Sequence, residues 1–336
     1  MSTAERDAAS FLARWNKKAD REVAFDASTS KLETLFIPLG VPPVDDVLGG
    51  GFARNRITIL YGEESSGKTL ITQLLCAEAQ RAGGFAVFCD AERTFSPGWS
   101  RMLGMELGLD KLLILRPRIL EQAFDMMIDA LETLRPDVLV FDSLPALLPQ
   151  QVDDKEMTDN DSRGVFPRKA GEGMGRLNQA NENTAILVIN QMRVKQGVVY
   201  GSPDDMPGGK KVRHEASVVL RVRRGEIQTD GGSKDKDAER VGQTIRVRTE
   251  KNKIAPPWRT AEFDVKFTGE VDLVALLVSR ALELGVLSSK AGYFRLMEQE
   301  KPLAHGRDTL EALLKEDETL RISVEYLCDE AEGKNE

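Results

Sequence analysis

YGEESSGKTL, residues 61–70, is the stretch that decides the fold. The apolar pentad RITIL (56–60) precedes it, and ITQLLCAEAQ (71–80), with apolar residues at helical spacing, follows it. A strand that turns tightly into a helix is the context in which G-x-x-x-x-G-K-[ST] binds phosphate. The alternative, a glycine-rich turn with a chance lysine, requires the pattern and both flanks to agree by accident. The sequence therefore predicts an α/β fold around a nucleoside triphosphate site.

The loop from Gly62 to Gly67 can turn successive backbone N–H groups toward a phosphate, and the N-terminus of the next helix adds positive dipole. In this pattern Lys68 reaches the β- and γ-phosphates and Thr69 places its hydroxyl on Mg²⁺. The predicted ATP-binding loop comprises Gly62, Glu63, Glu64, Ser65, Ser66, Gly67, Lys68, Thr69 and Leu70.

Polar residues also end three other apolar runs. DVLVFD (137–142) ends in Asp142, which is expected to share the Mg²⁺ with Thr69, although an aspartate there can also cap a turn. FAVFCDAER (85–93) carries Asp90 and Glu92, and a carboxylate there could orient the water that attacks the γ-phosphate. AILVIN (185–190) is followed by Gln191, so two neighbouring amides are able to bond the γ-phosphate and report which nucleotide is bound.

Composition narrows the class of protein. A chain of 336 residues with 41% hydrophobic content can bury one large core and form a smaller domain as well. No apolar run of about 18 residues and no signal-peptide pattern are found, so we expect a cytoplasmic protein without a membrane partner. Three scattered cysteines and two histidines favour neither a disulfide framework nor a zinc site. The net charge of −8 does not exclude DNA, because a DNA site needs only local basic residues.

The pattern along the chain predicts three parts. Residues 1–34 form an N-terminal helix and linker, and the helix packs on its own core or docks on a neighbouring subunit. Residues 35–270 form an α/β core, in which five strands separated by helices are expected to be parallel and three later strands antiparallel. Residues 271–336 form a small α+β C-terminal domain with an acidic tail. Residues 233–240 are predicted to be a solvated insertion.

Two long segments lack a clear helical or strand pattern. Residues 192–213 are rich in glycine, carry more basic than acidic residues, and are predicted to have no regular structure. Such loops are usually functional or disordered, and the plain alternative is a solvated surface loop. The second segment, about 151–170, follows the strand that ends in Asp142.

GEESSGKT, DAER, FDSLPALLP, INQMRVKQGVVYGSPDDMPGG and KNKIAPPWRTAEF occur in this order, and together they resemble the RecA recombinases of bacteria and phages. The resemblance extends over roughly residues 35–330, since SSKAGYF and GRDTLEALLKEDETLRISVEYL are similar to the small C-terminal RecA domain. It implies a RecA-like P-loop ATPase core with a mostly parallel sheet and an antiparallel β extension.

The resemblance also implies roles for single residues around ATP. Glu92 matches the glutamate that activates water, and Gln191 matches the glutamine that senses the γ-phosphate and orders the following loop. Lys251 and Lys253 match lysines that reach the ATP of the neighbouring subunit, with the electrostatic role of an arginine finger. The resemblance places two aromatic residues near the adenine, Trp99 from the same subunit and Phe267 from the adjacent one.

For DNA, the resemblance implies that the loops at about 151–170 and 192–213 line the axis of a helical filament. Basic side chains would contact phosphates and glycine amides would approach the backbone, which gives binding without sequence preference. The implied DNA-binding residues are Arg168, Arg176, Arg193, Lys195, Gln196, Gly197, Val198, Gly208, Gly209 and Lys210.

The chain departs from the family at three places. Gln196 replaces the apolar wedge that separates base triplets, a role open to Val198 or Val199, and His214 replaces a phenylalanine that links ATP state to the loop. The first loop contains Pro167 and several glycines, so less helix is expected there than in the family. The sequence thus predicts an ATP-dependent recombination and repair protein that forms a filament on single-stranded DNA and exchanges strands with duplex DNA. The alternatives are a RecA-like regulator without strand exchange and a hexameric helicase-type ATPase.

Overall fold

The computed structural model describes residues 3–19, 23–27, 32–153, 164–194, 204–229, 238–297 and 301–331. The chain forms two compact units, Met1–Leu35 and Phe36–Glu336. The first unit contains α1 (Thr3–Ala19), so the predicted N-terminal helix is present. Its Phe11 and Trp15 side chains remain 51% and 39% exposed. Docking of this helix on a neighbouring subunit stays a prediction.

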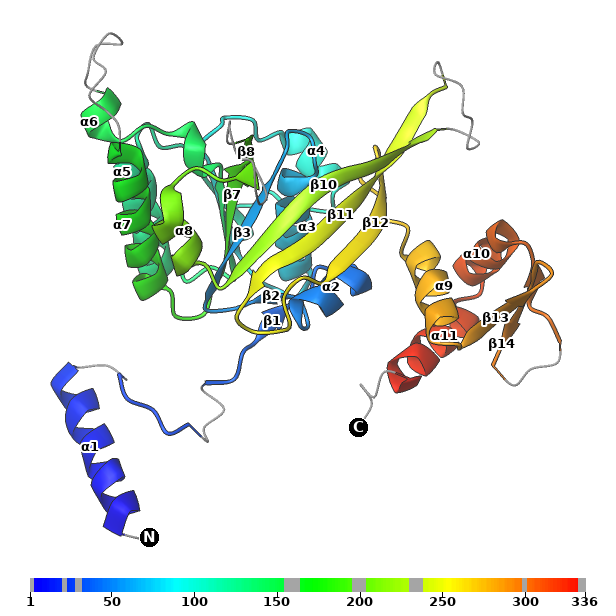
Figure 1. The fold of residues 1–336 in the computed structure, drawn as a ribbon, viewed down its shortest axis with the longest axis horizontal. Coiled ribbons are helices and arrows are strands. Elements are labelled where there is room, and N and C mark those ends of the chain that lie inside the picture. Colours follow the sequence, from blue (N-terminus) through cyan, green and yellow to red (C-terminus); the bar gives the residue numbers. More distant parts are fainter. Residues whose placement is uncertain are drawn as a thin grey trace. The chain divides into compact units, whose positions relative to one another are not determined.

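A sheet in the order β12-β11-β10-β3-β7-β6-β4-β5 forms the centre of the second unit (Figure 1). Its strands are β3 (Arg56–Gly62), β4 (Ala86–Asp90), β5 (Leu112–Leu115), β6 (Val138–Asp142), β7 (Ala185–Gln191), β10 (Val218–Thr229), β11 (Arg240–Asn252) and β12 (Thr260–Lys266). The five apolar runs predicted as parallel strands are β3 to β7, and they pair in parallel. The next strand differs from the prediction, because β10 pairs parallel with β3 and antiparallel with β11.

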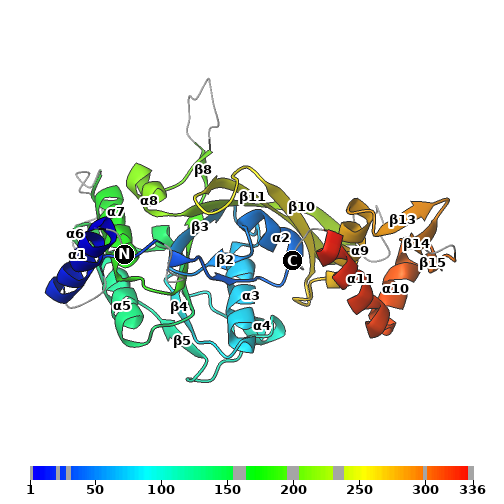
Figure 2. The same ribbon diagram turned by 90° about the horizontal axis from the view of Figure 1, so that it is seen from below.

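Helices cover both faces of the parallel strands, which is why these strands are continuous apolar runs. Figure 2 shows α3 (Lys68–Arg81) on one side of the sheet, and α5 (Leu120–Thr133) with α7 (Val165–Ala180) on the other. Helix α2 (Pro42–Leu48) packs on the same side of the sheet as α3. Helix α8 (Gly209–Glu215) packs on the side of α5 and α7. The mostly parallel α/β fold predicted from the sequence is confirmed.

The loop predicted at about 151–170 does not extend as far as residue 170, because α7 runs from Val165 through Pro167 and its glycines. A Cβ on Gly173 would lie 2.2 Å from the Phe124 ring, and one on Gly171 would lie 2.9 Å from the Lys211 side chain. These glycines therefore let α5 and α8 approach the helix closely, and they do not mark a loop. Pro167 is tolerated because it lies in the first turn, whose N–H groups have no partner within the helix.

The shorter elements of the described core are β1 (Phe36–Ile37), β2 (Phe52–Ala53), α4 (Pro97–Met102), the 3₁₀ helix η2 (Leu144–Ala146), α6 (Gln150–Asp153), β8 (Arg193–Val194) and β9 (Asp204–Asp205). Strands β8 and β9 pair antiparallel. With α8 they show that the prediction of no regular structure over 192–213 is wrong at both ends of that segment. Most of the 233–240 insertion lies outside the described residues.

The C-terminal elements surround a separate core made by buried residues such as Val278, Leu310 and Val324. They are α9 (Leu273–Glu283), β13 (Leu287–Lys290), β14 (Tyr293–Leu296), β15 (Ala304–His305), α10 (Arg307–Glu316) and α11 (Glu318–Ala331). A domain boundary at residue 270 remains a prediction. Within the ranges that the structure describes, no helix is both long enough and apolar enough to cross a membrane.

Candidate functional site

The phosphate loop connects β3, which ends at Gly62, to α3, which begins at Lys68. Gly67 has φ 99°, a left-handed conformation that glycine adopts without steric cost. At Gly62 a Cβ would lie 2.0 Å from the Val222 carbonyl oxygen on β10. Both glycines of the pattern thus have a local structural reason, and the strand, turn and helix occur as predicted.

Lys68 lies within the loop and is 9% exposed. Its Nζ donates to the carbonyl oxygens of Gly62 at 3.1 Å and Glu63 at 2.6 Å. Burial lowers the pKa of Lys68, and the nearby carboxylates of Asp142 and Glu92 oppose that effect. The ammonium group is therefore held among oxygen atoms at the loop, where phosphate oxygens could replace the carbonyls.

Thr69 and Asp142 lie together, since the Thr69 hydroxyl donates to Asp142 Oδ2 at 2.8 Å. Burial raises the pKa of Asp142 to about 6, against the lowering effect of the Thr69 hydrogen bond. A hydroxyl and a carboxylate are hard oxygen ligands and fit Mg²⁺. Among the described residues, no group of three or more His, Cys, Asp or Glu side chains could hold a metal alone. Any Mg²⁺ here would therefore also require phosphate or water oxygens.

Two exposed side chains meet beside the loop. Gln191 Nε2 lies 3.5 Å from Glu92 Oε1, and the Ser143 hydroxyl donates to the same oxygen at 2.5 Å. The second oxygen, Oε2, is left for another donor. Residue patterns did not indicate Ser143, although its position directly after Asp142 could have pointed to it.

Asp90, the other carboxylate considered for the attacking water, has a structural role. It is 1% exposed, and its Oδ1 accepts from the backbone N–H groups of Thr94 at 2.9 Å and Phe95 at 3.2 Å. Its Oδ2 pairs with Arg116 at 2.9 Å. The geometry therefore favours Glu92 as the carboxylate that is free to meet a water.

Asn190 does not face the phosphate loop as the pattern had suggested. It is fully buried, and its Nδ2 donates to the Pro207 carbonyl at 2.9 Å, two residues before α8 begins. The side-chain amides of Asn190 and Gln191 therefore point in different directions. The Gln191 side chain lies beside Glu92, and Asn190 hydrogen-bonds the backbone that leads into α8.

Leu70, the last residue of the predicted ATP-binding loop, is buried within α3. Of the two aromatic residues predicted near the adenine, Trp99 on α4 is partly buried against the core on the α3 side of the sheet. Phe267, just after β12, is 46% exposed, as a contact with another subunit would require. Their contact with an adenine stays a prediction.

The two lysines predicted to act across a subunit interface, Lys251 and Lys253, have different surroundings within the chain. Lys251 Nζ donates to the last carbonyls around α8, those of Arg213 at 2.8 Å, His214 at 3.0 Å and Ala216 at 2.6 Å. Burial, followed by repulsion from Lys253, lowers the pKa of Lys251 to about 8. The Lys253 side chain is exposed. Lys251 therefore has a structural role that its sequence pattern did not indicate.

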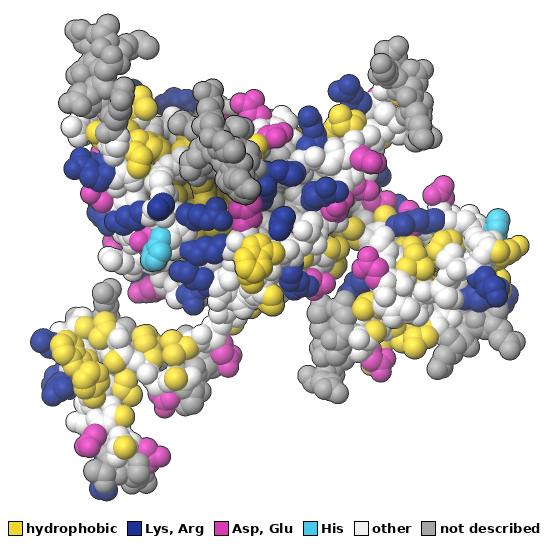
Figure 3. All heavy atoms as spheres, in the orientation of Figure 1, with side chains coloured by type: hydrophobic (Ala, Val, Ile, Leu, Met, Phe, Trp, Pro, Cys, Tyr) yellow, Lys and Arg dark blue, Asp and Glu magenta, His cyan; other side chains and the backbone are white. Residues whose placement is uncertain are grey.

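Most of the candidate DNA contacts within the described residues lie on helices or at a helix start. Arg168 and Arg176 are exposed on α7, where Arg176 pairs with Asp125 on α5 at 3.3 Å, and Lys210 is exposed on α8. Gly208 and Gly209 have φ 98° and 73° and begin α8. Arg193 lies in β8, and Lys195, Gln196, Gly197 and Val198 lie outside the described residues. Figure 3 shows lysine and arginine side chains gathered over the face that carries α7 and α8.

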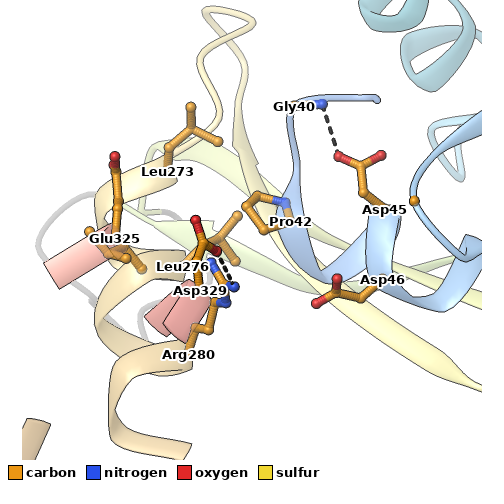
Figure 4. Close-up of a pocket in the computed structure, with 11 residues that line it drawn as sticks. Gly40, Pro42, Asp45, Asp46, Leu273, Leu276, Arg280, Glu325 and Asp329 are labelled. Atoms are coloured by element: carbon orange, nitrogen blue, oxygen red, sulfur yellow. Dashed lines mark hydrogen bonds and ion pairs between the residues drawn. The ribbon is translucent and has the colours of Figure 1, made fainter. Parts of the chain in front are cut away.

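A hollow of about 500 Å³ lies elsewhere, between α2 and helices α9 and α11 (Figure 4). The lining includes several carboxylates, and Arg280 pairs with Asp329 at 2.7 Å. Asp45 accepts from the backbone N–H groups of Leu39 at 2.7 Å and Gly40 at 3.1 Å. Because an acidic lining repels phosphate, this hollow does not compete with the loop as a nucleotide site.

The fold and the loop define a P-loop nucleotide-binding protein. The family model for the RecA N-terminal domain matches residues 16–272. Among curated proteins, the chain is 37% identical to Protein RecA of Chlorobaculum tepidum over 86% of this chain and 81% of that protein. It is 35% identical to Protein RecA of Roseiflexus castenholzii over 89% and 83%, and 33% identical to that of Frankia casuarinae over 94% of each. The chain belongs to the RecA family, the recombinases of homologous recombination and repair.

Proposed function

We propose that this protein is a DNA-dependent ATPase that forms a helical filament on single-stranded DNA and exchanges strands with homologous duplex DNA. ATP would bind at the loop with Mg²⁺, and the protein would act in the cytoplasm, or in a host cytoplasm if it is of phage origin. Family membership supports the class of activity. The residues below are our assignment of how this chain performs it.

In this assignment Lys68 would exchange the Gly62 and Glu63 carbonyls for the β- and γ-phosphates, and Thr69 and Asp142 would hold Mg²⁺. Bound Mg²⁺ would neutralise charge on the phosphates. Glu92 orients the attacking water through Oε2, because its Oε1 is occupied by Ser143. Lys253 from the next subunit, with Lys251 if it leaves α8, would stabilise charge that develops on the γ-phosphate.

The observation that carries the proposal is the pair of amides that end β7. Gln191 lies 3.5 Å from Glu92, and Asn190 holds the Pro207 carbonyl just before α8. A movement of Gln191 toward a γ-phosphate would therefore pull on the backbone at the other end of the DNA loop. Such a connection is what a nucleotide-controlled DNA-binding loop requires.

A RecA-like regulator that assembles on DNA without strand exchange is the second candidate. The observation that favours it is His214, which is exposed on α8 where the family resemblance implies a phenylalanine that couples ATP to the loop. A weaker coupling would suit a protein that binds DNA and recruits others.

ATP hydrolysis with and without single-stranded DNA tests the ATPase assignment. We expect the wild type to hydrolyse ATP faster on DNA and Lys68→Ala to lose this activity while remaining folded by circular dichroism. Turnover that does not respond to DNA in the wild type, or persists in Lys68→Ala, would contradict the assignment.

A further inference from the structure

Glu250, near the end of β11, connects three elements around the phosphate loop. Its Oε2 lies 3.3 Å from Arg213 Nη2 on α8, and its Oε1 lies 3.8 Å from Arg221 Nη1 on β10. Arg221 lies opposite Tyr61 in the pairing of β10 with β3, and the Glu250 carboxylate also raises the pKa of the Tyr61 phenol. One side chain therefore acts on the strand that leads into the phosphate loop, the adjacent strand, and the helix that follows the DNA loop.

The four side chains differ in exposure. Tyr61 is 3% exposed, and the side chains of Arg221, Glu250 and Arg213 are 12%, 21% and 43% exposed. A buried tyrosine hydroxyl needs a polar neighbour, and Glu250 is the carboxylate that acts on it. Burial first, and then this carboxylate, raise the pKa of Tyr61, so the phenol stays a donor. Buried Tyr61 is therefore the fixed side of the cluster, and the half-exposed Arg213 is the side that can open.

Tyr61 and Arg213, the two outer members of the cluster, lie next to the phosphate loop and in the helix that follows the DNA loop. Tyr61 directly precedes Gly62, the first residue of the phosphate loop. Arg213 lies in α8, which follows the DNA loop and packs beside α7 (Figure 1). The residue after Glu250, Lys251, donates to the carbonyls at the end of α8. Two consecutive residues of β11 therefore hold the C-terminal part of α8.

We propose that Glu250 is a positioning residue that fixes α8 to the strand of the phosphate loop and thereby sets how strongly DNA binding changes ATP turnover. The proposal rests on the proposed function for its DNA partner. A single half-exposed ion pair has little effect on stability, so a purely structural role would leave little to measure. Because Arg221 lies opposite Tyr61 on the strand that leads into the phosphate loop, the two ion pairs of Glu250 connect that strand to α8.

The test uses Glu250→Ala, which removes the carboxylate, and Tyr61→Phe, which removes only the hydroxyl. The matched control is Glu262→Ala, which deletes a carboxylate paired with Arg246 on the same sheet but away from α8. Glu250→Gln is the conservative variant, since it keeps an acceptor oxygen at the same place and removes only the charge. The first readout is amide hydrogen exchange of residues 209–216 in the nucleotide-free protein, and the second is the ratio of ATP turnover with and without single-stranded DNA.

In Glu250→Ala we expect amide exchange over 209–216 to rise about fivefold and the turnover ratio to fall about fivefold, as for modest coupling between sites. Both changes should be smaller in Tyr61→Phe and Glu250→Gln. The KM for ATP should stay near that of the wild type, and Glu262→Ala should change neither readout. If Glu250→Ala does not fold, Tyr61→Phe decides the question.

Unchanged exchange and an unchanged ratio in Tyr61→Phe and Glu250→Ala would overturn the proposal, as would equal changes in Glu262→Ala. A wild type without DNA-stimulated turnover would instead contradict the proposed function. The exchange readout would then still show whether Glu250 positions α8.

Discussion

At the scale of single residues, the structure gives different roles to side chains that look alike in the sequence. Asp90 and Glu92 both follow an apolar strand, but Asp90 is buried with Arg116 and two backbone N–H groups, whereas Glu92 is exposed beside Gln191. The spacing of residues along the chain cannot show which carboxylate turns inward, because that depends on an arginine 26 positions away.

Glu92→Gln is expected to lower ATP turnover by about 10²-fold or more, the usual contribution of a positioned base. ATP binding, DNA binding and the thermal midpoint should stay close to those of the wild type, because Glu92 is exposed. Single-turnover hydrolysis with a fluorescent-nucleotide binding assay measures both effects. Wild-type turnover in this variant would exclude Glu92 from the role.

At the scale of elements, strands were easier to predict from the sequence than the helices beside the DNA loop. RITIL and DVLVFD are short apolar runs, and β3 and β6 occupy their positions because local composition is enough. The glycines of α7 looked like a loop because their partner, Phe124, belongs to another helix. Close packing between segments that are distant in the sequence leaves no local sequence pattern. For the same reason, the hydrogen bond from Asn190 to the Pro207 carbonyl could not be predicted.

A pair of glycines on α7 tests this interpretation. Gly173→Ala should lower the free energy of unfolding by about 1–3 kcal/mol, because its Cβ would lie 2.2 Å from the Phe124 ring. Gly175→Ala should instead raise it by about 0.5–1 kcal/mol, since the nearest atom is 3.7 Å away and alanine favours helix. Urea unfolding measures both, and equal effects of the two changes would contradict the packing argument.

Helix α2 carries a pH-dependent group, since burial raises the pKa of Asp45 from 3.8 to about 7. Between these values the folded protein holds this proton more tightly than the unfolded chain does. The contribution of Asp45 to stability is therefore full below pH 4 and is lost as the pH rises through about 7. In Asp45→Asn this change is absent.

Relative to the wild type, Asp45→Asn should thus become more stable as the pH rises from 4 to 7, by at most ~1.4 kcal/mol per pH unit. Above pH 8 the difference between the two proteins should be constant. Urea unfolding at several pH values measures it. A difference that does not vary with pH would show that Asp45 titrates normally.

At the scale of the whole molecule, the order of the family motifs along the chain predicted the class of protein. The order of GEESSGKT, DAER and KNKIA indicated the RecA family, which the comparisons confirm. The local role of Lys251 was not predictable, because its acceptors are carbonyls of α8, which the glycine-rich sequence did not suggest.

Lys253→Ala is the cleaner test of subunit contact, since Lys251 also holds α8. We expect DNA-dependent turnover to fall at least about tenfold, as when a charge supplied by a neighbour is removed. The free energy of unfolding of the monomer should change by less than about 0.5 kcal/mol, because the Lys253 side chain is exposed. Lys290→Ala, which changes an exposed lysine of the C-terminal elements, is the control, and equal losses in both variants would argue against a role across the interface.

The central claim is that ATP held by GEESSGKT drives pairing of homologous DNA, and strand exchange tests it most directly. Homologous single-stranded and duplex DNA would be mixed with ATP and Mg²⁺, and joint molecules counted for the wild type and Lys68→Ala. The account predicts joint molecules with the wild type alone. Filaments on single-stranded DNA without joint molecules, or joint molecules formed equally well by Lys68→Ala, would contradict it.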